Sequence, residues 1–95
     1  MNRMTLQVKD EVGLHARPAA IFVKQAGQFD CEIQVRNLTT ESDWVDAKSI
    51  LSVLTLGIEQ NHEIELEAEG PDEQTAITAL SALVLSDFSD KPVEA

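Results

Sequence analysis

The sequence is short of positive charge, has one cysteine and contains no long apolar run, and each shortage excludes a class of protein. Its formal net charge is −10, which argues against nucleic acid and anionic membranes as partners, because neutralising phosphates requires a surplus of lysine and arginine. Cys31 has no second cysteine with which to form a disulfide or a thiolate metal cluster. No apolar run reaches the roughly 18 residues that span a bilayer, and the first residues lack the apolar core of a signal peptide. We therefore expect a cytoplasmic protein that does not insert into membranes.

Residues that break secondary structure are also scarce. The 95 residues include three prolines and four glycines, and 43% of them are apolar. This composition suffices for a modest hydrophobic core and does not suit a disordered chain. We expect one globular domain over residues 1–95, with Cys31 as a small buried side chain.

The spacing of apolar residues predicts seven elements. Alternation predicts strands over residues 4–8, 31–36, 44–45 and 63–69, and spacings of three and four predict helices over 16–26, 47–57 and 71–88. The strand at 44–45 rests on the weakest pattern. The order is strand, helix, strand, strand, helix, strand, helix, which indicates an α+β protein with its helices on one side of an open sheet.

Two of these segments carry patterns that a simple core does not explain. In the helix at 47–57, Ile50, Leu51 and Leu54 fall on one side and Val53 and Leu56 roughly opposite, so only one side can face the core. In the strand at 63–69, four glutamates alternate with apolar residues. Because such a row cannot be buried, we expect the sheet to expose one face to water.

The stretch GLHARPAA, residues 13–20, places a histidine and an arginine at the start of the first predicted helix. If Ala16 opens the helix, the backbone N–H groups of Ala16 and Arg17 have no acceptor within it and favour anions. Pro18 suits the first turn because its missing N–H costs no helical bond there. A positive environment disfavours imidazolium, so His15 is expected to be neutral and nucleophilic near neutral pH. A phosphoryl group on His15 would then sit beside these amides and the Arg17 guanidinium.

The residues alone leave other roles of His15 open: a metal ligand, an acid–base catalyst, or a helix cap without chemical function. A metal site has little support, because the only other histidine, His62, is expected to be a solvated residue in the turn before the last strand. A hydrolytic triad would need a serine or cysteine against His15, which the sequence does not show.

Two motifs carry a family resemblance. GLHARPAA resembles the active-site motif of the HPr family, the histidine-containing phosphocarriers of the bacterial phosphoenolpyruvate-dependent sugar phosphotransferase system. AKSILSVLTLGI, residues 47–58, is similar to the second signature of that family, around a regulatory serine. The resemblance implies an open-faced β-sandwich, in which three helices cover one face of a four-stranded antiparallel sheet.

The resemblance also implies roles for the site residues. His15 would take the phosphoryl group through its Nδ1 from phosphorylated enzyme I and pass it to enzyme II A components of sugar transporters. Arg17 would stabilise the loaded histidine. The protein would be a monomeric carrier that is not itself an enzyme, and it would need no metal or cofactor.

By the same resemblance, both partners would dock on one patch formed by Ile50, Leu51 and Leu54, together with Ala20 and Lys24. Ser49 matches the serine that HPr kinase/phosphorylase modifies in part of the family. A phosphate there would suit the start of a helix, but the carboxylates of Asp43 and Asp46 would repel it. The residues alone suggest instead that Ser49 caps the helix.

Two further interpretations remain. A phosphocarrier of a side branch, serving nitrogen regulation or dihydroxyacetone phosphorylation, would have identical site chemistry and different partners. A purely regulatory binding module that works through Ser49 would not need the imidazole of His15. The turn over residues 37–44 is longer than is usual in the family, and the second half of the chain is unusually acidic.

Overall fold

The computed structural model describes residues 2–9 and 16–86. The elements in chain order are β1 (Asn2–Gln7), α1 (Ala16–Ala26), β2 (Glu32–Asn37), β3 (Val45–Asp46), α2 (Ile50–Leu54), β4 (Glu63–Glu69) and α3 (Glu73–Leu85). This order confirms the predicted succession of strands and helices. In the described ranges, every helix is too short or too polar to cross a membrane.

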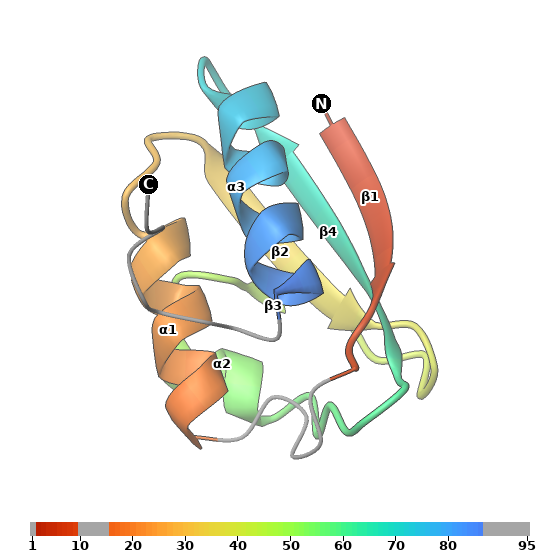
Figure 1. Ribbon diagram of the computed structural model, residues 1–95. Coiled ribbons are helices and arrows are strands. Elements are labelled where there is room, and N and C mark those ends of the chain that lie inside the picture. Colours follow the sequence, from red (N-terminus) through yellow and green to blue (C-terminus); the bar gives the residue numbers. More distant parts are fainter. Residues whose placement is uncertain (1, 10–15, 87–95) are drawn as a thin grey trace.

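The four strands form one antiparallel sheet in the order β1-β4-β2-β3. In the register, Leu66 of β4 lies opposite Met4 of β1 and Val35 of β2. Figure 1 shows α1 and α3 over one face of this sheet, and α3 contacts β1 and β4 directly. The fold is therefore the α+β open-faced sandwich that the sequence predicted.

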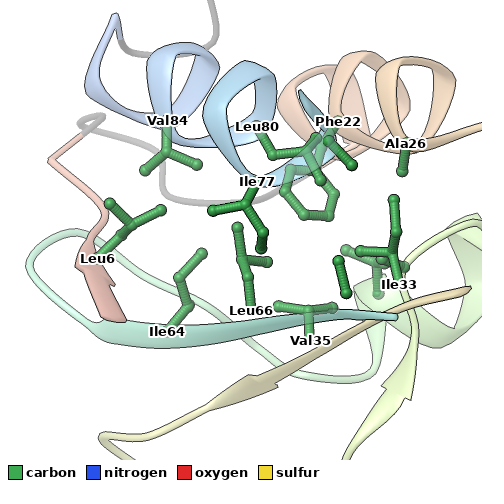
Figure 2. Packing of buried hydrophobic residues seen from close by; sticks show 14 of the residues in the cluster. Leu6, Phe22, Ala26, Ile33, Val35, Ile64, Leu66, Ile77, Leu80 and Val84 are labelled. Carbon is green, nitrogen blue, oxygen red and sulfur yellow. The ribbon is translucent and has the colours of Figure 1, made fainter. Parts of the chain in front are cut away.

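The core lies between the sheet and the helices (Figure 2). Every second residue of each long strand points toward the helices, because side chains alternate between the two faces of a strand. The sheet contributes Leu6, Ile33, Val35, Ile64 and Leu66, and the helices contribute Phe22, Ala26, Ile77, Leu80 and Val84. All of these side chains are buried.

The opposite face of the sheet is open, as predicted, but the two middle glutamates of β4 are partly covered. The side chains of Glu65 and Glu67 are only 12% and 18% exposed. Arg36 Nε donates to Glu65 at 2.9 Å and Arg3 Nε donates to Glu67 at 3.0 Å. Both guanidinium groups also lie over the ring of Trp44, at 5.0 and 5.8 Å from its centroid. Cation–π contacts and ion pairs therefore partly cover the middle of this face. Of the four glutamates of β4, only Glu63 and Glu69, at its ends, are exposed.

The start of α3 is joined to the start of β2 by the carboxylate of Asp72. It accepts hydrogen bonds from the backbone N–H groups of Asp30 and Cys31, each at 2.9 Å. The bond from Asp30, followed by the contacts with Cys31, lowers the pKa of Asp72. Burial, followed by a hydrogen bond to Asp72, raises the pKa of the Cys31 thiol to about 11. Cys31 is thus the small buried residue that was predicted, and its thiol stays protonated at neutral pH.

Replacing Asp72 by asparagine is expected to lower stability above about pH 4. Because the pKa of Asp72 is lowered in the folded protein, its carboxylate stabilises the fold above the pKa of the unfolded chain. That contribution is lost as the pH falls through the folded pKa. The measurement is the Tm of both proteins between pH 7 and pH 2.5. Asp43→Asn removes the same charge from an exposed side chain and should leave the profile unchanged; equal profiles for all three proteins would contradict the role of Asp72.

Candidate functional site

The first helix begins at Ala16, as the sequence predicted. His15 and Gly13 lie outside the described residues, and the described part of the motif begins at Ala16. Pro18 is buried in the first turn of α1, where a missing N–H breaks no helical bond. Arg17, next to it, is exposed.

The helix α1 buries one face and exposes the other. Ala19, Phe22 and Ala26 are fully buried in the core, and α1 contacts α3. Phe22 was not part of the spacing pattern that predicted this helix. Ala20 and Lys24 are exposed. The helix carries no acidic residue in its first turn and Lys24 in its last turn, which complements the negative end of the helix dipole.

The helix α2 has only five residues, and its start is capped by Ser49, whose Oγ accepts from the backbone N–H of Ser52 at 3.4 Å. Val53 is fully buried and Leu56, just beyond the helix, is 5% exposed, whereas Leu51 is 75% exposed. Ile50 and Leu54 are also exposed. The predicted division of this segment into a buried side and an exposed side is therefore confirmed.

The exposed residues of the two helices form a surface that we call the α1–α2 surface, defined by Ala20, Lys24, Ile50, Leu51 and Leu54. Figure 1 shows α2 beside the N-terminal half of α1, and the two helices are in contact. Of the five large apolar side chains that are exposed in the described residues, three belong to α2. Apolar residues gathered in this way are typical of a protein-binding surface.

Charge on this surface differs in sign from the charge of the chain as a whole. The residues of α1 include Arg17 and Lys24 and no acid, and α2 carries no charge. The net charge of the whole chain is −10, and many of its acids lie on β4 and in the loops. The two helices therefore present an apolar and locally positive region on an acidic protein.

The segment before α2 determines the surroundings of Ser49. The backbone N–H of Ser49 donates to the carbonyl of Asp46 at 3.1 Å, and the Asp46 carboxylate accepts from the N–H of Lys48 at 2.9 Å. Lys48 Nζ donates to the carbonyl of Phe29 at 2.6 Å. The capping role predicted for Ser49 is confirmed, and Asp46 lies in the turn that leads to it.

His62 differs from the prediction of a solvated turn residue. It is partly buried, and its Nδ1 accepts from the backbone N–H of Glu59 at 3.1 Å and lies 3.1 Å from Asn37 Nδ2. No local pattern indicated these contacts, because Asn37 is distant in the chain. Among residues 2–9 and 16–86, no three histidine, cysteine, aspartate or glutamate side chains are placed to hold a metal ion.

Comparisons with known proteins match nearly the whole chain. The family model described as the PTS HPr component phosphorylation site matches residues 3–86. The multiphosphoryl transfer protein of Vibrio cholerae is 41% identical over 80 residues, which are 84% of this chain and 20% of that protein. The phosphocarrier protein HPr of Mycoplasma pneumoniae is 38% identical over 84 residues, which are 88% of this chain and 93% of that one.

Solved structures agree with these sequence matches. The crystal structure of an HPr from Thermoanaerobacter tengcongensis superposes with a TM-score of 0.88 at 41% identity, over 97% of this chain and 100% of the other. This chain thus spans about a fifth of the multiphosphoryl transfer protein and nearly the full length of the two HPr proteins. By sequence and by fold, the chain belongs to the HPr family of phosphocarrier proteins.

Proposed function

We propose that this chain is a phosphocarrier of the phosphotransferase system, which accepts a phosphoryl group on His15 from phosphorylated enzyme I and passes it to enzyme II A components. The observation that supports this function is the family match over residues 3–86, because its model describes a phosphorylation site and the range includes the GLHARPAA motif. The carrier acts as a single domain over residues 1–95, as a monomer in the cytoplasm, and without a cofactor.

The start of α1 supplies the chemistry that such a carrier needs. In the transfer, a nitrogen–phosphorus bond forms at Nδ1 of His15 as the bond between phosphorus and the donor breaks. His15 directly precedes α1 in the sequence, and the first-turn N–H groups of Ala16 and Arg17 point out of this end of the helix. These N–H groups favour the negative phosphoryl oxygens. The guanidinium of Arg17 adds a planar pair of donors. Transfer then depends mainly on positioning and charge.

Both partners use the α1–α2 surface in this proposal. Leu51 and its apolar neighbours on α2 supply the area that is buried on docking, and Lys24 contributes a charged contact at the rim. Because enzyme I and enzyme II A bind the same residues beside His15, their binding is mutually exclusive. The carrier must leave one partner before it reaches the other.

Ser49 is the proposed regulatory site, modified by an HPr kinase/phosphorylase. Its Oγ already caps α2, so a phosphate at this atom would sit at the N-terminal end of the helix, next to Ile50. About two negative charges would then lie at the edge of the α1–α2 surface, and docking would weaken. The nearby carboxylate of Asp46 opposes the modification.

The test is to incubate the full chain with labelled phosphoenolpyruvate and enzyme I. One acid-labile phosphate per chain is expected, and none on His15→Ala. Incubation with ATP and the kinase should instead add one acid-stable phosphate, which Ser49→Ala would lack. Label retained by His15→Ala would place the acceptor elsewhere, and an unlabelled parent chain, with an enzyme I that loads another HPr normally, would overturn the proposal.

A further inference from the structure

The side chain of Asn37 joins three segments that are distant in the sequence. It is fully buried at the end of β2. Its Nδ2 donates to the carbonyl of Leu56, directly after α2, at 3.2 Å, and lies 3.1 Å from Nδ1 of His62. Its Oδ1 accepts from the backbone N–H of Thr40 in the turn after β2, at 3.3 Å. One side-chain amide therefore joins the end of α2, the loop before β4 and the β2–β3 turn.

The neighbours of Asn37 determine which way its amide points. The carbonyl of Leu56 can only accept and the N–H of Thr40 can only donate, so the amide nitrogen must face Leu56 and the amide oxygen must face Thr40. The remaining hydrogen of Nδ2 then points at the imidazole of His62. The backbone N–H of Glu59 points at the same ring nitrogen, from 3.1 Å.

Two donors that converge on Nδ1 require this nitrogen to carry a lone pair. His62 must therefore be neutral, with its hydrogen on Nε2. A proton on Nδ1 would direct the N–H groups of Asn37, Glu59 and His62 toward one another, with no acceptor among them. The buried Nδ2 of Asn37 would then have one hydrogen without an acceptor, and a buried donor left unpaired is costly.

We propose that the side chain of His62 is a pH-sensitive latch. When neutral, it accepts from Asn37 and Glu59; when protonated, it loses both hydrogen bonds and loosens the loop between α2 and β4, which stays attached to Val8 through its backbone. His62 is only partly buried, so water can exchange protons with the ring. The latch is next to the C-terminal end of α2, because the amide of Asn37 also donates to the carbonyl of Leu56. Acidification that protonates the ring loosens this junction.

The charged groups around the latch do not replace its hydrogen bonds. On its own segment the charged neighbours are Glu59 and Glu63. Lys9 lies two residues beyond β1, Glu41 lies in the β2–β3 turn, and α2 carries no charge. The carbonyl of His62 accepts from the N–H of Val8, which places the end of β1 beside it. No carboxylate in the described part of the chain forms an ion pair with the His62 ring, so none compensates there for the two lost hydrogen bonds.

The test is an NMR titration of the full, ¹⁵N-labelled chain from pH 8 to pH 5.5. Imidazole spectra at pH 8 should show the hydrogen of His62 on Nε2. The backbone amide of Glu59 and the side-chain amide of Asn37 should shift together, at the same midpoint as the ring signals of His62. In His62→Gln, whose amide oxygen accepts at every pH, neither signal should titrate. In His62→Phe, which lacks an acceptor, both should show the low-pH positions already at pH 8.

Melting curves give an independent measurement. In a His15→Ala background His62 is the only imidazole, and the unfolding equilibrium constant should rise about threefold more between pH 8 and pH 5.5 than in His15→Ala/His62→Gln. A hydrogen on Nδ1 at pH 8 would overturn the latch. So would Glu59 and Asn37 signals that do not follow the titration of His62. Neither result bears on phosphoryl transfer, so the latch and the proposed function can fail separately.

Discussion

Replacing Leu51 by aspartate is expected to weaken binding to the two proposed partners, enzyme I and enzyme II A, by about 100-fold, while the fold stays intact. The side chain is 75% exposed, so its removal empties no cavity. Aspartate in the first turn of α2 also interacts favourably with the helix dipole. In the complex, by contrast, an unpaired carboxylate would be desolvated in place of an apolar contact, which costs about 3 kcal/mol. Titration calorimetry with each partner and a melting curve measure the two effects separately.

Two further variants separate charge from lost apolar contact. Thr75→Asp places the same charge at an exposed position in the first turn of α3. Figure 1 shows that α3 begins at the end of the molecule away from α2. Thr75→Asp should leave both affinities unchanged. Leu51→Ala should bind each partner with an affinity between that of the parent chain and that of Leu51→Asp. A large fall in Tm for Leu51→Asp would show that Leu51 is part of the core, and unchanged affinities would remove α2 from the docking surface.

Periodicity was sufficient to predict most of the fold, because the buried and exposed sides of each element follow from spacing alone. The division of the 47–57 segment is the clearest case. A spacing of 100° per residue separates Leu51 from Val53, and the structure exposes the first and buries the second. The same reasoning located the start of α1 at Ala16. Both are local properties, in which each residue depends on neighbours three or four positions away.

Contacts between distant segments could not be predicted in this way. The cover of Arg3, Arg36 and Trp44 over the middle of the sheet depends on strand order, which brings β1, β2 and the residue before β3 to one face. The partners of His62 likewise depend on the approach of β2 to the loop before β4. Spacing carries no information about strand order, so the four outward glutamates predicted an open face but not the ion pairs that partly cover it.

The turn between β4 and α3 is another place where distant segments meet, and there only glycine fits. Gly70 has a φ of 149°, a conformation that residues with a side chain rarely adopt. A Cβ built on Gly70 would lie 2.7 Å from both Cα and Cβ of Cys31. Because Cys31 is buried and its backbone N–H is bound by Asp72, the neighbouring backbone cannot easily move away.

Gly70→Ala is therefore expected to destabilise the protein by about 2–5 kcal/mol, the sum of backbone strain and overpacking. In a domain of this size each kcal/mol lowers the Tm by roughly 4–8 °C, so the loss should be obvious in a melting curve. Gly57→Ala is the matched control, since Gly57 has a φ of 58° but nothing lies within 4 Å of the added Cβ. That variant should lose only about 1 kcal/mol, the cost of the left-handed conformation. Equal losses for the two variants would mean that the contact with Cys31 contributes nothing, and that backbone conformation alone selects glycine at both turns.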